Sequence, residues 1–201
     1  MEEEKKVEKR ERRPTRDTWR TKGWYDVIAP AMFGSAKIGE TPALDMRQIR
    51  GRVLESTLGD LIDDFSKSHI KLFFQVKGID GNRAVTKFIG HDIASDYVRS
   101  QVRRRVSKIG GTWGTTTSDG YKLRLNAMAT TLKRIQSSQV EAIRALMKEV
   151  IEQRAKERTF DQFVQEIVLG KLSSDIYKVI KKICPVRRVE VQKTKLIGEP
   201  A

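Results

Sequence analysis

The chain has 201 residues, 38% of them apolar, and its 40 Lys and Arg against 26 Asp and Glu give a net charge of +14. Because such a surface repels itself, we expect a polyanionic partner, and nucleic acid is the commonest one. A single cysteine, Cys184, excludes an intrachain disulfide framework and a zinc ribbon. The sequence shows neither a membrane-length apolar run nor a signal peptide, so we expect a soluble protein of the cytoplasm, free or in an assembly.

Residues 1–18 are almost wholly charged, and apart from Met1 their one aliphatic residue is Val7. We predict a disordered tail, because this segment has nothing with which to form a buried face. Ordered structure is expected from about residue 22, with a short strand at 25–29 that ends at Pro30.

Two hairpins are predicted in the middle of the chain. Apolar residues at every second position predict a strand over 69–80, and Asp80-Gly81 separates it from the strand-like run 83–90. Asp119-Gly120 joins 110–117 to 121–131 in the same way. Asp-Gly is a strong hairpin signal because the central residues of primed turns need positive φ. The second hairpin is expected to turn these residues inward: Tyr121, Leu123, Leu125, Ala127 and Ala129. Two such hairpins predict a small antiparallel β-barrel over about 22–135.

A basic helix is predicted between the hairpins. It would begin at Ser95-Asp96 and end at Gly110-Gly111. Its valines at 98, 102 and 106 would form a thin apolar stripe, since residues four apart share a face.

Helices and a closing strand are predicted for the rest of the chain. Capping-box spacing at Ser138 and Glu141 opens a helix to about residue 158, and Thr159 and Gln162 open a second that Gly170 ends. A third helix covers 173–183. Alternating residues over 187–197 predict a strand that pairs with the barrel's edge, followed by a tail at 198–201. The fold class is therefore α+β, with one domain over 19–197, flanking helices over about 138–184 and a C-terminal strand returning to the sheet.

The stretch from Arg99 to Arg134 contains one acid, Asp119. Long basic side chains reach phosphates on either wall of an A-form groove, and arginine adds bidentate geometry. We predict RNA contacts at Arg99, Arg103, Arg104, Arg105 and Lys108, although a charge run is more commonly a solvated helix face.

Further RNA contacts are predicted on the strands and at the start of the ordered chain. Solubilising the barrel exterior is an equally good interpretation of the strand residues, which are Lys122, Arg124, Lys133, Arg134, Arg187, Arg188, Lys193 and Lys195. Trp24, beside Lys22, could stack on an unpaired base, although packing in a core or at a barrel end is the commoner use of tryptophan.

Metal or catalytic chemistry is not expected. His69, His91 and Cys184 do not have the spacing of a metal site, and Cys184 fits a buried, inert thiol. Acids at 60, 63 and 64 are more commonly an exposed helix surface than a catalytic pair. We therefore expect no enzyme, no metal and no cofactor.

A series of short motifs is shared, in order and spacing, with a known family. They are KGWYDV at 22–27, APAMF at 29–33, GET at 39–41, GRVLE at 51–55, VRR at 102–104, TSDGY at 117–121 and CP at 184–185. Over about 20–197 the chain resembles the archaeal and eukaryotic small-subunit ribosomal proteins called S-one-e, or S-three-a. Without the long C-terminal extension of the eukaryotic members, the chain resembles the archaeal type.

This resemblance implies a β-barrel with flanking helices, bound to small-subunit ribosomal RNA on the platform near the messenger exit. It implies a structural role in subunit assembly and translation, beside neighbouring ribosomal proteins, with messenger RNA as a further candidate partner and no homo-oligomer. Two alternatives stay open. A free RNA-binding factor would have the same composition, and a nuclease would need clustered carboxylates or an activated histidine.

Overall fold

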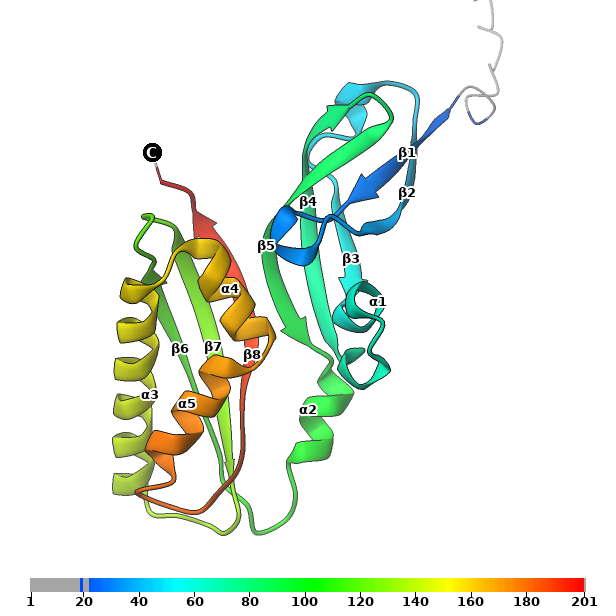
Figure 1. Cartoon of the computed structure of the whole chain (residues 1–201). Coiled ribbons are helices and arrows are strands. Elements are labelled where there is room, and N and C mark those ends of the chain that lie inside the picture. Colours follow the sequence, from blue (N-terminus) through cyan, green and yellow to red (C-terminus); the bar gives the residue numbers. More distant parts are fainter. Residues whose placement is uncertain (1–18, 20–21, 201) are drawn as a thin grey trace, which may run out of the picture.

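The computed structural model describes Trp19 and residues 22–200, apart from the side chain of Met46. These residues form an α+β fold, as predicted (Figure 1). The strands are β1 (Gly23–Ile28), β2 (Lys37–Ala43), β3 (Val53–Thr57), β4 (Ile70–Asp80), β5 (Arg83–Ile93), β6 (Lys108–Thr116), β7 (Lys122–Thr131) and β8 (Val186–Gly198). The helices are α1 (Leu58–Ile62), α2 (Ser95–Gln101), α3 (Ser137–Glu157), α4 (Phe160–Val168) and α5 (Lys171–Ile180), with 3-10 turns η1 (Ala31–Phe33), η2 (Met46–Gln48) and η3 (Phe65–Lys67). The predicted tail at 1–18 lies outside the described residues.

Strand β5 joins two lobes of one mixed sheet. Along one edge it pairs with β4, and β4 pairs with β3. On its other edge, the N-terminal half runs parallel to β1 and the C-terminal half runs antiparallel to β8. The N-terminal lobe is therefore β1–β5, and the C-terminal lobe is β6–β8 covered on one face by α3, α4 and α5 (Figure 1).

The predicted closed antiparallel barrel is not confirmed. The sheet formed by the described residues has the order β2-β1-β5-β8-β7-β6, and it is open. The two hairpins cannot close on each other because β8 lies between β5 and β7, and β1 is parallel to β5. The prediction that the terminal strand lies at an edge is wrong: β8 lies in the interior of the sheet, where it pairs with β5 on one side and β7 on the other.

Both predicted hairpins are confirmed. Gly81 turns β4 into β5 with φ of 59°, and Gly120 lies in the β6–β7 turn with φ of 83°. In that second turn the Thr117 N–H donates to the Tyr121 carbonyl at 3.0 Å. The apolar face of β7 is fully buried against α3, α4 and α5, as its alternation predicts.

The three C-terminal helices are also confirmed, with shifted starts. Helix α3 is capped by Gln136 and Gln139 instead of Ser138 and Glu141, because the two glutamine side chains satisfy each other's backbone N–H groups. Helix α4 follows Thr159 as expected, and Gly170 separates it from α5 with φ of 83°. Helix α5 begins at Lys171 and ends at Ile180, before Cys184 and Pro185.

The predicted helix between the hairpins is shorter than its valine spacing suggested. Helix α2 ends at Gln101, and Gly110-Gly111 lies within β6. Val98 packs with Ile93 and Met128, whereas Val102 is exposed and has extended backbone angles. Continuing the helix would stack arginines one turn apart without burying more apolar surface, so the chain turns instead.

Candidate nucleic-acid interface

Three loops meet at one end of the C-terminal lobe. The loop 102–107 leads into β6, the loop 132–136 leaves β7, and the segment 181–185 leads into β8. The register places Lys108, Thr130 and Arg188 side by side across the three strands, so all three loops lie at the same end of the sheet. We call this end, with the adjoining strand residues, the basic end.

Backbone hydrogen bonds hold these loops together. The Thr131 N–H donates to the Ser107 carbonyl at 3.0 Å, and the Leu132 N–H donates to the Pro185 carbonyl at 3.1 Å. The buried Thr131 hydroxyl accepts from the Ser107 N–H at 3.1 Å and donates to the Lys133 carbonyl at 2.6 Å. The loops therefore form one preorganised surface.

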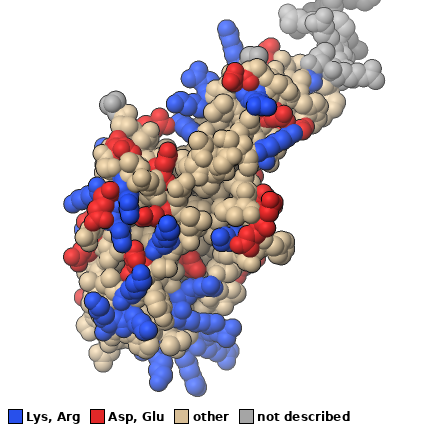
Figure 2. Space-filling view, in the orientation of Figure 1, with Lys and Arg blue, Asp and Glu red and all other residues tan. Residues whose placement is uncertain are grey.

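The surface of the basic end carries cations without acids. Segments 102–108, 132–136 and 181–188 contain no Asp or Glu. Their basic side chains are all exposed: Arg103, Arg104, Arg105, Lys108, Lys133, Arg134, Lys181, Lys182, Arg187 and Arg188. Figure 2 shows the blue side chains gathered at the lower end of the molecule. Arg99, exposed on the last turn of α2, continues this surface. Among residues 22–200, Arg188 is the one member of this set with an acid within ion-pair distance.

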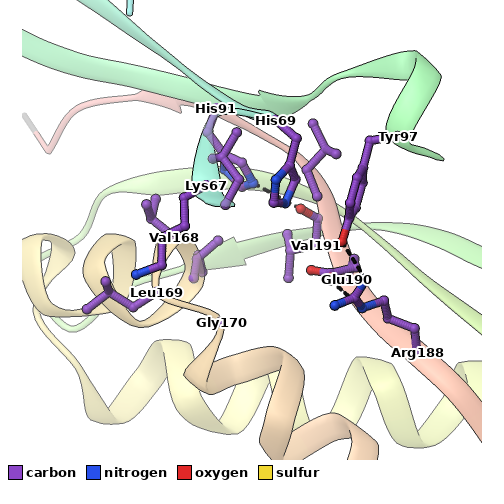
Figure 3. Close-up of a pocket in the computed structure, with 13 residues that line it drawn as sticks. Lys67, His69, His91, Tyr97, Val168, Leu169, Gly170, Arg188, Glu190 and Val191 are labelled. Carbon is purple, nitrogen blue, oxygen red and sulfur yellow. Dashed lines mark hydrogen bonds and ion pairs between the residues drawn. The ribbon is translucent and has the colours of Figure 1, made fainter. Parts of the chain in front are cut away.

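Arg188 has a structural role as well. Its guanidinium donates to the Tyr97 hydroxyl at 2.6 Å and lies 3.2 Å from the Glu190 carboxylate (Figure 3). Tyr97 stacks on His69, with ring centroids 3.9 Å apart. Together these residues border a cavity of about 240 Å³ between the lobes. Burial raises the pKa of Glu190 and lowers that of His69. Because Tyr97 and Glu190 already hold its guanidinium, Arg188 is less available to a phosphate than the neighbouring cations.

His91 lies deeper in the same cavity wall (Figure 3). The ring is 2% exposed, and its Nε2 is 2.9 Å from the Val191 carbonyl, which can only accept. Nε2 therefore carries the proton, and Nδ1 accepts from the Thr194 hydroxyl. Burial lowers the pKa of His91, so the ring is neutral and holds β5 to β8.

Four of the predicted contacts lie instead on the outer face of the C-terminal sheet, away from α3–α5. Arg124 and Lys195 are exposed and directly opposite each other on β7 and β8. Like charges in opposite positions destabilise a strand pair unless an anion lies between them. Lys122, near the end of the same face, is exposed, whereas Lys193 pairs with Asp92 at 2.8 Å. This face has fewer unpaired cations than the basic end.

Lys22 and Trp24 lie on the N-terminal lobe, and the structure does not bring them to the basic end. Trp24 is 54% exposed on β1, opposite Pro42. The Lys22 ammonium lies 4.5 Å from the centre of the Trp19 ring. An exposed indole is compatible with base stacking. Because Trp24 lies on the other lobe from the basic end, it belongs to a separate surface.

The carboxylates considered for catalysis do not form a reactive cluster. Asp60 accepts a hydrogen bond from the Thr57 hydroxyl at 2.7 Å, and Asp64 caps η3. Within the described part of the chain, no group of three metal-ligating side chains converges. Cys184 is buried, and burial raises the pKa of its thiol. The described helices include none of the length and apolarity that a bilayer span needs.

Sequence reasoning missed Lys181 and Lys182. The sequence contains a signal for them, because residues 176–189 hold five cations and no acid, but this run spans a predicted helix and a predicted strand. The fold joins that run to the loops from residues 102 and 132, which are distant in sequence.

A preorganised cationic surface on an α+β scaffold, built from segments that contain no acid, defines a protein suited to a polyanionic partner. The profile of the Ribosomal S3Ae family matches residues 10–200, so the chain belongs to this family, which is a family of ribosomal proteins and not of enzymes. Three similar proteins are each named small ribosomal subunit protein eS1. That of Desulfurococcus amylolyticus is 48% identical, over 92% of this chain and 87% of its own length. That of Sulfurisphaera tokodaii is 47% identical, over 92% and 96%. That of Saccharolobus islandicus is 42% identical, over 92% and 89%.

Proposed function

We propose that this protein is a structural component of the small ribosomal subunit in the cytoplasm and that it binds small-subunit ribosomal RNA through the basic end. The observation that carries the proposal is a group of ten exposed cations, seven on three loops joined by hydrogen bonds and three on the adjoining strand ends, without an acid in those segments. Phosphate contacts position a protein on RNA, and this surface offers that kind of contact. Family membership supplies the ribosomal context.

The finer assignments belong to the same proposal. The protein would lie on the platform near the messenger exit, as one copy per subunit, beside other ribosomal proteins and within reach of messenger RNA. Arg99, Arg103, Arg104, Arg105, Lys108, Lys133, Arg134 and Arg187 would be the main phosphate contacts, with Lys181 and Lys182 added. Arg188 would mainly position the loops, since Tyr97 and Glu190 hold its guanidinium. The outer-face cations and Lys22 with Trp24 would make secondary contacts.

The test is a double charge reversal, Arg103→Glu with Arg104→Glu, in a tagged full-length chain. Incorporation is measured as copies per small-subunit RNA on a sucrose gradient, before and after a high-salt wash. The matched control is Arg47→Glu with Arg50→Glu, which makes the same charge change at exposed positions in and beside η2.

We expect the control to stay near one copy after the wash, and the loop variant to fall several-fold below it. Unchanged incorporation of the loop variant would mean that the basic end does not contact RNA. A wild-type pool far below one copy, and removed by salt, would favour a free RNA-binding factor over a ribosomal component.

A further inference from the structure

An apolar groove lies between the two lobes, away from the basic end. Its walls come from Met32 and Phe33 of η1, Leu61 and Ile62 of α1, and Val168 and Leu169 at the end of α4. It encloses about 280 Å³. Gln165 is its one polar lining residue, and its amide already donates to the Met32 carbonyl at 2.7 Å. The groove therefore presents mainly apolar surface, and its one polar side chain is already tied to the chain.

Large apolar side chains in and near this groove are exposed. Ile62 is 46% exposed and Leu169 is 49% exposed, on opposite walls of the groove. Phe65, three residues after α1, is 90% exposed. Exposed apolar side chains that line one groove are typical of a protein-binding surface, because burying them in a partner removes apolar area from water.

The rim of the groove is acidic, in contrast to the rest of this basic molecule. Asp60, Asp63 and Asp64 lie on and directly after α1, and Figure 2 shows the red group there beside uncharged surface. The one cation in segment 58–67 is Lys67, which lies 3.7 Å from the Asp64 carboxylate. Hydrogen bonds from Ser66 lower the pKa of Asp64, so this carboxylate is charged at neutral pH.

We propose that this groove binds a basic segment of another protein, with an apolar side chain between α1 and α4 and flanking Lys or Arg facing the three aspartates. Charge complementarity determines the class of the partner: the three carboxylates repel the phosphates of RNA and attract Lys and Arg. The inference goes beyond the proposed function, since the groove and the basic end share no residue.

The experiment places a photo-crosslinker at the most exposed position, as Phe65→p-benzoyl-phenylalanine, in the full chain assembled into small subunits. After irradiation, crosslinked peptides are identified by mass spectrometry. Two variants test the groove: Ile62→Ser with Leu169→Ser, and Asp60→Asn with Asp63→Asn. Asparagine tolerates the left-handed backbone of Asp63, whose φ is 57°. The control is Glu141→Gln with Glu149→Gln, the same charge change on the exposed face of α3.

We expect crosslinks to one segment of a different protein, and we expect that segment to carry a net positive charge. Their yield should fall several-fold in both groove variants and stay unchanged in the control, while all chains remain incorporated. A synthetic peptide of the identified segment should then bind the free wild-type protein more tightly than either groove variant.

The proposal is overturned by crosslinks to RNA, to a second copy of this chain or to acidic segments. It is also overturned by a lack of protein crosslinks in normally incorporated chains, or by yields that the groove variants leave unchanged. Because incorporation is measured in each case, failure at the groove is distinct from failure of RNA binding at the basic end.

Discussion

Gly90 lies on β5 where this strand pairs with β8 and joins the two lobes. A Cβ at this position would lie 2.3 Å from the Thr194 carbonyl oxygen and 3.2 Å from its carbonyl carbon. Both are backbone atoms, so the contact can be relieved only by separating β5 from β8.

We therefore expect Gly90→Ala to lower the free energy of unfolding by about 1–3 kcal/mol, the usual cost of overpacking, as measured by urea denaturation. Gly114→Ala is the control, because a Cβ there meets nothing within 4 Å. Equal losses in the two variants would show that the close approach is not what requires glycine.

His91 should make stability depend on pH. Burial lowers its pKa below the ordinary 6.5, so the unfolded chain takes up a proton at a pH where the folded chain does not. The contribution of His91 to the free energy of unfolding is then fully present above pH 7 and falls as pH drops through about 6.5, by at most about 1.4 kcal/mol per pH unit.

The check is urea denaturation of wild type and His91→Gln between pH 7.5 and 5.5. The variant should be less stable at pH 7.5 and should show a flatter pH profile. His69 also has a lowered pKa, so His69→Gln measures its separate share. A slope that His91→Gln leaves unchanged would mean that the buried ring does not titrate in this range.

At the scale of elements, Thr131 joins loops that belong to different strands. Thr131→Val removes the hydroxyl and leaves the Ser107 N–H and the Lys133 carbonyl without this partner. We expect a loss of about 1–3 kcal/mol in the free energy of unfolding, as for buried groups left unsatisfied.

RNA affinity of the same variant should fall several-fold while its salt dependence stays the same, because no charge is lost. Thr112→Val, at an exposed position on β6, is the control and should change neither quantity. A changed salt slope in Thr131→Val would contradict a purely positioning role.

The elements were predictable where sequence and packing agree. Gly81 and Gly120 fix their hairpins locally, and the alternation along β7 places its buried face correctly. The valine spacing at 98, 102 and 106 predicted a helix that is too long. A helical spacing of apolar residues stabilises a helix only where other side chains pack against those residues. Val98 has such a surface in Ile93 and Met128, whereas Val102 has none.

At the scale of the whole molecule, the basic end should make RNA binding steeply dependent on salt. The logarithm of the association constant falls by roughly 0.7–0.9 per phosphate contact for each tenfold rise in salt. Arg103→Gln with Arg104→Gln should reduce this slope by about 1.4–1.8 if each arginine neutralises one phosphate.

The measurement is a titration of small-subunit ribosomal RNA at several salt concentrations, with Arg47→Gln and Arg50→Gln as the matched control. The control should keep the wild-type slope. A wild-type affinity that does not vary with salt would show that protein neighbours hold this chain in place.

The sequence by itself determined the charge, the secondary structure of most segments and the family, because these depend on composition, local periodicity and the order of motifs. Only the tertiary structure decided that the sheet is open, with β8 between β5 and β7. It also decided that three loops distant in sequence form one cationic surface, with Lys181 and Lys182 included. The physical reason is that strand pairing over long separations depends on which edges find partners, and that choice is made by the whole core rather than by any local run of residues.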